Sequence, residues 1–107
     1  MSKSLQELGI EIRAINAANG WSVTQPEEWA DKYKFPAILA LIHSEVSEAL
    51  EAFRENDETH FCEEMADVFI RVLDCVVALD NDFDATVEAK LNVNRTRGYH
   101  HGGKKRI

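Results

Sequence analysis

Four acidic residues stand in two pairs that share the same short spacing. Glu45 and Glu48 are three residues apart, and Glu64 and Asp67 repeat that interval. Residues three apart lie on the same side of an α-helix, so each pair can direct two carboxylates to one place. Oxygen ligands of this kind suit Mg²⁺ and Mn²⁺. The spacing therefore predicts a divalent-cation site, provided that the two pairs face each other.

A helical hairpin would make the two pairs face each other. Apolar periodicity predicts two long helices, over about 36–54 and 58–79, joined by a short polar link. If the chain bends at Asn56, the inner acid of each pair is eight residues from the bend and the outer acid is eleven. At about 1.5 Å per residue, the facing acids then lie level, roughly 12 and 16 Å from the turn.

The simpler alternative is that these acids are solvated surface residues, with Asp67 paired to Arg71 four residues later. The helical wheel argues against it, because it puts Glu45 inside the apolar arc of its helix. Glu64 likewise flanks apolar positions of the next helix. A carboxylate at the edge of a core is costly unless something compensates its charge.

A second group of polar residues follows helical spacing near the C-terminus. Lys90, Asn94, Arg97 and His101 share one face if the last helix continues that far. Cationic and amide donors suit phosphate oxygens. The alternative is that Lys and Arg near a helix C-terminus only complement the helix dipole.

Composition limits the class of protein. The 107 residues are expected to form a single domain, 1–107, with the apolar and charged content of an ordinary soluble chain. The net charge of −7 argues against binding to polymeric nucleic acid. No apolar run suggests a membrane span or a signal peptide. Cys62 and Cys75 are too far apart on one helix to bridge each other, and we expect them to be reduced core thiols of a cytoplasmic protein.

The remaining elements are also predicted to be helical. An amphipathic helix over about 4–18 begins with a capping box formed by Ser4 and Glu7. A short helix is expected from Pro26, and a fourth main helix after Asp82. We therefore expect an all-α fold, an antiparallel bundle of four main helices. The buried residues expected from the helix 36–54 are Leu39, Ile42, Val46, Ala49, Leu50 and Phe53.

The helix 58–79 is apolar around most of its circumference. Such a helix is central in its bundle. In so short a chain it is also expected to contact another subunit, which predicts a homo-oligomer.

The two polar groups together resemble a known family. The pattern Glu45-x-x-Glu48, then Glu64-x-x-Asp67, then Lys90 through Arg97 resembles the MazG-like all-α nucleoside triphosphate pyrophosphohydrolases. The resemblance spans about residues 29–99. Many members have a second acid directly before the first motif residue, whereas this chain has Ser44, which is more similar to the dCTP pyrophosphatase-like branch.

The resemblance implies an activity and a cofactor. It implies Mg²⁺-dependent hydrolysis, with Mn²⁺ able to substitute, of a nucleoside triphosphate to the monophosphate and pyrophosphate. The substrate would be a dNTP such as dCTP or a non-canonical nucleotide, removed as house-cleaning of the nucleotide pool. The family also implies a dimer or tetramer with sites near subunit interfaces.

The resemblance also implies roles for individual residues. Glu45 or Glu48 would be the general base, and Lys90, Asn94 and Arg97 would hold the pyrophosphate. The implied metal ligands are Glu45, Glu48, Glu64 and Asp67.

Residues for the nucleoside are a weaker prediction. Trp29 and Tyr33 precede the helix 36–54, where related enzymes place residues that line the nucleoside site; Trp21, Asn16 and Asn19 are further candidates. Aromatic rings stack on bases, and amides can bond base edges. The alternative is that both Trp residues close the core.

Two other functions remain open at this point. The chain could be a catalytically silent helical oligomer that acts as an interaction module, and Mg²⁺-dependent pyrophosphate release would separate that function from the enzyme. A di-iron carboxylate bundle usually needs Glu-x-x-His, and no His follows Glu45, Glu48 or Glu64 at the third position.

Overall fold

The computed structural model of the protein describes residues 2–97. Its elements are, in order, α1 (Leu5–Ala18), the 3₁₀-helix η1 (Pro26–Ala30), α2 (Lys34–Arg54), α3 (Glu58–Leu79) and α4 (Phe83–Thr96). The described residues contain four α-helices and no strand. This confirms the all-α class. No helix in this part of the chain is long and apolar enough to cross a membrane.

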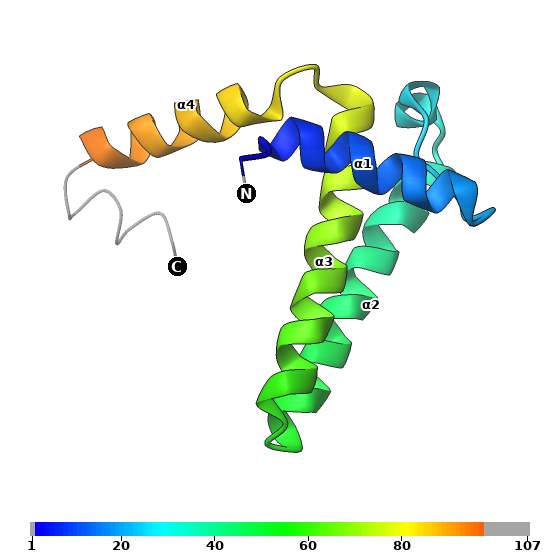
Figure 1. Cartoon of the computed structure of the whole chain (residues 1–107), viewed down its shortest axis with the longest axis vertical. Helices are drawn as coiled ribbons and strands as arrows, with labels where there is room; N and C mark the ends of the chain where they lie inside the picture. The colour runs from blue at the N-terminus through cyan, green and yellow to red at the C-terminus, as the bar shows by residue number, and fades with distance from the viewer. Residues whose placement is uncertain (1, 98–107) are drawn as a thin grey trace.

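Helices α2 and α3 form the predicted antiparallel hairpin, the longest feature of the molecule (Figure 1). The chain bends at Asn56, whose φ of 60° lies in the left-handed region that Asn tolerates better than most residues. Asp57 then caps α3 by accepting a hydrogen bond from the His60 N–H at 3.0 Å. The bend at Asn56 confirms the predicted alignment of the two helices, in which Glu48 lies level with Glu64 and Glu45 lies level with Asp67.

Helix α2 begins two residues before the expected entry at Pro36. The carboxylate of Asp31 accepts hydrogen bonds at 2.9 Å from the N–H groups of Tyr33 and Lys34. These bonds satisfy donors that a helix start leaves unpaired. Pro36 is tolerated inside the first turn because its missing N–H has no intrahelical partner there.

Helix α1 crosses the open end of the hairpin and packs on α3 (Figure 1). It starts with the predicted capping box of Ser4 and Glu7. The crossing is close because Gly9, which is buried, faces Val77 with no side chain between the two helices. The small core that results consists of Ile12, Phe35, Ala49, Ala52, Leu73 and Cys75.

Helix α4 is attached to the rest of the chain mainly at its first turn. The Asp84 carboxylate accepts hydrogen bonds at 2.9 Å from the N–H groups of Leu5 and Gln6, which caps α1 from a distant part of the sequence. Beyond this attachment α4 projects away from the hairpin (Figure 1). It ends at Thr96, so Arg97 lies just past the helix, and His101 lies outside the described residues.

Part of the expected core is exposed in the single chain. Ala49 is buried, but Leu50 is 47% exposed and Phe53 is 71% exposed, and Leu39 and Val46 resemble Leu50. The prediction of burial was therefore wrong for these four residues within one chain, because no described element covers that face of the hairpin. Cys75 is a buried free thiol as expected, whereas Cys62 is exposed, so the core-thiol prediction was wrong for Cys62.

Candidate functional site

Three of the four predicted carboxylates meet on one side of the hairpin. Glu45 and Glu48 from α2 and Glu64 from α3 each offer an oxygen, and these oxygens lie within 4.8 Å of one another. The side chains of Glu45 and Glu64 are only 13% and 12% exposed. The helical wheel had placed these two acids at the edge of the core, and the structure agrees.

The three carboxylates repel one another. The negative charge of Glu64, and next that of Glu45, raises the pKa of Glu48 above its usual value; a weaker contribution comes from Asp67. Asp67 is not in the group of three, but its charge acts on the same carboxylate. The group of carboxylates therefore holds more negative charge than the described residues around it neutralise.

Two cationic or titratable side chains flank the acids. Arg71 donates from Nε to Oε2 of Glu45 at 2.9 Å, across the hairpin. His60 Nε2 lies 2.9 Å from Oε2 of Glu64, and this hydrogen bond raises the pKa of His60. The alternative pairing of Arg71 with Asp67, one turn before it on α3, is not the one adopted.

A cleft of about 750 Å³ adjoins the carboxylates. Its walls come from the second half of α1, the segment 20–22, α2 and α3. The lining residues are Ile12, Ile15, Asn16, Gly20, Trp21, Ser22, Leu41, Glu45, Asp67, Ile70, Arg71 and Asp74. Because two predicted metal ligands line it, the cleft and the acids form one continuous site of a size suited to a small-molecule ligand.

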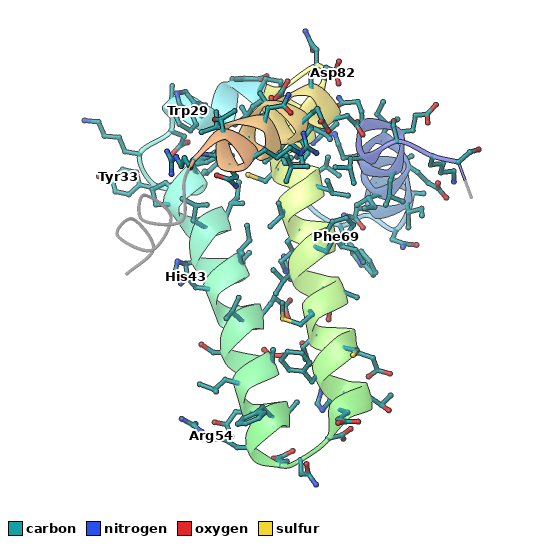
Figure 2. The ribbon with its side chains drawn as sticks, turned by 90° about the vertical axis from the view of Figure 1, so that its left-hand side faces the viewer. Trp29, Tyr33, His43, Arg54, Phe69 and Asp82 are labelled. Atoms are coloured by element: carbon teal, nitrogen blue, oxygen red, sulfur yellow. The ribbon has the colours of Figure 1, made fainter. Side chains whose placement is uncertain are left out.

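The candidate nucleoside residues divide into two groups. Asn16 and Trp21 line the cleft. Trp29, Tyr33 and Asn19 do not line it. Trp29 and Tyr33 lie at the open end of the hairpin (Figure 2), where the Trp29 ring packs edge-on against Phe35 with centroids 5.1 Å apart. Trp29 and Tyr33 remain 67% and 85% exposed, so neither closes the core.

The predicted phosphate-binding residues are not brought to the carboxylates within one chain. Lys90 and Asn94 lie exposed on α4, and Arg97 follows its end. Helix α4 contacts α1 at its start and then leads away from the hairpin (Figure 1).

The structure places one arginine in the site and a second beside it, neither of which was predicted from the sequence to belong there. The first is Arg71. It follows Glu64 by seven residues and Asp67 by four, and this helical spacing was the signal that all three share one face of α3. The other is Arg13, whose Nη1 donates to Oδ1 of Asp74 at 2.9 Å and to the Thr24 carbonyl at 2.6 Å.

This Arg13–Asp74 pair holds α1, α3 and the segment after α1 together at the side of the cleft. Burial raises the pKa of Asp74, and Arg13 opposes that effect. The pair therefore positions the wall that carries Asn16 and Trp21.

The donor set fits a hard divalent cation. Three carboxylate oxygens converge, and their mutual repulsion is the kind that a cation relieves. They lie beside a cleft that also presents amide, aromatic and guanidinium groups.

Comparison with known proteins agrees with this chemistry. No curated protein and no solved structure was found to match the chain. One family matches, described as the MazG nucleotide pyrophosphohydrolase domain, over residues 34–97, which is more than half of the chain and runs from the start of α2 to the end of α4. Enzymes of this family generally depend on a divalent metal ion. The chain therefore belongs to the MazG nucleotide pyrophosphohydrolase family and is a nucleoside triphosphate pyrophosphohydrolase.

Proposed function

We propose that this protein hydrolyses a deoxynucleoside triphosphate such as dCTP, or a non-canonical nucleotide, to the monophosphate and pyrophosphate, and that it does so in the cytoplasm as a house-cleaning enzyme. The observation that carries the proposal is the convergence of three carboxylates beside a nucleotide-sized cleft. The preference for dCTP rests on the small Ser44 before Glu45, a feature similar to the dCTP pyrophosphatase-like branch.

The chemistry is assigned to the hairpin. Glu45, Glu48, Glu64 and Asp67 would hold Mg²⁺, or Mn²⁺ in its place. When bound, the ion supplies positive charge against the phosphates and lowers the pKa of a water molecule. Glu45 or Glu48 would accept the proton of the water that attacks the α-phosphorus. Cleavage between the α and β phosphates then releases pyrophosphate.

The nucleoside would occupy the part of the cleft farther from the carboxylates. Trp21 offers an aromatic face for stacking, and the Asn16 amide can both donate to and accept from a base edge. The phosphates would point towards Glu45 and Asp67, which line the same cleft. Trp29 and Tyr33, which stand outside the lining, remain predicted contacts to be tested by substitution.

A homo-oligomer, either a dimer or a tetramer, would cover the exposed apolar face of the hairpin. Large side chains of α2 and α3 that stand 38–71% exposed in one chain and do not line the cleft include Leu39, Val46, Leu50, Phe53, Phe61, Met65 and Phe69. Large apolar side chains left exposed in such number are typical of a protein–protein interface. A mass near 12 kDa by light scattering at micromolar concentration would contradict the assembly.

We further propose that Lys90, Asn94 and Arg97 of one subunit bind the pyrophosphate group of a nucleotide held by the carboxylates of a neighbouring subunit. Helix α4 leads away from the hairpin of its own chain (Figure 1), and assembly would carry it to the hairpin of another copy. Mixing subunits tests this arrangement. Glu48→Gln and Lys90→Ala should each be inactive or nearly so, and a re-annealed equimolar mixture should regain activity.

The size of that recovery can be calculated for a dimer. Half of the re-annealed dimers are mixed, and each mixed dimer has one site with both intact halves, so about a quarter of the wild-type rate should return. If α4 serves its own subunit, no site combines two intact halves and the mixture stays inactive. A mixture that shows no recovery, although mass analysis confirms exchange, contradicts the arrangement between subunits.

The main experiment measures pyrophosphate release from a panel of triphosphates with and without Mg²⁺. Glu48→Gln and Glu64→Gln should abolish turnover. Glu51→Gln and Glu63→Gln are matched controls, because these exposed glutamates stand on the same two helices outside the group of three, and they should remain active. Wild-type-like turnover by Glu48→Gln would remove the carboxylate group from the mechanism.

The position of bond cleavage needs a separate measurement. Reaction in ¹⁸O-labelled water should put the label in the monophosphate, since water attacks the α-phosphorus. Label found in orthophosphate would instead mean attack on the terminal phosphate, and the proposed reaction would be wrong.

A further inference from the structure

Arg71 takes part in both the carboxylate group and the cleft. Its Nε donates to Glu45 Oε2 at 2.9 Å, and its side chain also lines the cleft of about 750 Å³. It lines a second, adjoining cleft of about 300 Å³, together with Lys34 and Asp74. Among residues 2–97, no other side chain combines a hydrogen bond to a member of the carboxylate group with a place in both clefts.

The charge of Arg71 matters in two ways. Among the described residues that line the larger cleft, it is the only one with a cationic side chain. It is also the cation that forms an ion pair with Glu45. A divalent cation that shares Glu45 would therefore meet a competing positive charge at the same carboxylate.

The side chain of Arg71 has room to change its partner. It is 42% exposed, whereas Glu45 is only 13% exposed, so the guanidinium is the member of the pair that a ligand in the cleft can reach more easily. A guanidinium offers five N–H donors, and only Nε has a hydrogen-bond partner in the described residues. Its geometry matches phosphate oxygens as well as it matches a carboxylate.

We propose that Arg71 exchanges partners during the reaction cycle, binding Glu45 in the free enzyme and a phosphate oxygen of the nucleotide in the complex. This inference rests on the proposed function. A nucleotide that placed its base near Trp21 and its phosphates near Glu45 and Asp67 would pass Arg71, because all four side chains line one cleft. Binding of the cation at Glu45 would release the guanidinium at the place where phosphate charge arrives.

The exchange predicts two effects of opposite sign in one variant. In Arg71→Gln, Mn²⁺ should bind about threefold or more tightly in the absence of nucleotide, because a competing charge is gone. In the same variant kcat/KM for the triphosphate should fall about tenfold or more, because a charge-assisted phosphate contact is lost. Arg71→Lys should show a smaller loss of kcat/KM, since Lys keeps the charge without the planar fork.

A matched control is available on the same hairpin. Arg54 makes an Arg–Glu pair with Glu51 at 2.6 Å, is 62% exposed and lines neither cleft. Arg54→Gln removes the same charge and the same type of pair. It should change neither the Mn²⁺ affinity nor kcat/KM.

The test combines Mn²⁺ titration without nucleotide, followed by calorimetry, with steady-state kinetics of pyrophosphate release. Tighter Mn²⁺ binding together with reduced kcat/KM in Arg71→Gln, and neither change in Arg54→Gln, supports the exchange. Unchanged kcat/KM in Arg71→Gln overturns it. Weaker Mn²⁺ binding also overturns it, because Arg71 would then only hold Glu45 in place.

The same experiment separates this inference from the proposed function. If the wild-type protein neither binds Mn²⁺ nor releases pyrophosphate, the proposed function fails and the exchange fails with it. If the wild-type protein does both and Arg71→Gln behaves like it, only the exchange fails.

Discussion

Replacing Gly9 with alanine should destabilise the protein, although alanine is the better helix former. Gly9 lies in the middle of α1, buried where that helix crosses α3. A methyl group at this position would stand well inside van der Waals contact of Val77 Cγ2. It would also lie 3.2 Å from Val77 Cβ and 3.4 Å from the Leu73 carbonyl oxygen. Rotating Val77 cannot relieve a contact with its own Cβ, so the helices must separate.

Two opposing terms set the magnitude. Gly to Ala in a helix interior gains about 1 kcal/mol from propensity. Forcing an extra carbon into a close-packed contact typically costs about 1–3 kcal/mol. The net expectation for Gly9→Ala is a loss of about 1 kcal/mol in the free energy of unfolding. If α1 and α3 crossed loosely, only the gain in helix propensity would remain, and Gly9→Ala would be more stable than wild type by about 1 kcal/mol. The sign of the change in the free energy of unfolding therefore distinguishes a close crossing from a loose one.

Urea unfolding at one fixed protein concentration measures this sign, since the stability of an oligomer depends on concentration. Ala14→Gly, at an exposed position of the same helix, is the control for propensity alone and should lose about 1 kcal/mol. In Gly9→Ala the displaced α1 also carries Asn16 in the cleft wall, so KM should rise more than kcat falls. A Gly9→Ala protein more stable than wild type would refute the close crossing.

Three further outcomes are expected. The raised pKa of Glu48 means that folding disfavours its charged form, so the wild-type protein is penalised at a pH above the ordinary pKa of a glutamate but not at low pH. Without metal, Glu48→Gln should therefore unfold at a higher urea concentration than wild type at pH 7 but not at pH 3. The control Glu51→Gln should show no such gain. The hydrogen bonds from the first turn of α1 hold the pKa of Asp84 below its ordinary value. The stability that the charged Asp84 contributes is therefore present above the ordinary pKa and is lost as the pH falls through the lowered pKa. In Asp84→Asn, the urea midpoint should fall less steeply than in wild type between about pH 5 and 2. Arg13→Met should lower the free energy of unfolding in urea by about 2–4 kcal/mol, because it leaves the buried Asp74 carboxylate unpaired. An equal loss in Asp74→Asn alone and in the double variant would show that the two residues act as a unit.

The hairpin and its acids could be predicted from sequence because local signals determine them. Asn56 accepts a positive φ, and Asp57 caps the helix that follows. Helical spacing then brings the acids to one level without reference to the rest of the chain. The wheel located Glu45 and Glu64 at the core edge for the same reason, since the apolar arc of each helix is a property of its own sequence.

The direction of α4 could not be predicted in the same way. It depends on the bonds between Asp84 and the first turn of α1, residues about eighty positions apart. The exposure of Phe53 and Leu50 was missed for a related reason. Periodicity shows that a face is apolar, but it does not say whether the same chain or another copy covers it.

The pairing of Arg71 shows where local rules give way to burial. The i+4 rule favoured Asp67, which is exposed and keeps its water. Glu45 is 13% exposed and has lost most of its water, so a donor stabilises its charge more. Choosing between the two required the burial of each carboxylate, which only the packed hairpin provides.

The charges around the carboxylates form an ordered arrangement. Arg71 bonds Glu45 on one side, His60 bonds Glu64 on the other, and Glu48 lies with both acids in the group of three and has the raised pKa. The flanking partners reduce the repulsion, yet they leave charge at Glu48 that a cation would neutralise. A site compensated in full would gain little from metal, and one without flanking partners would oppose the packing of α2 on α3. The partial compensation by Arg71 and His60 therefore suits a group of carboxylates that both packs within the hairpin and retains affinity for a cation.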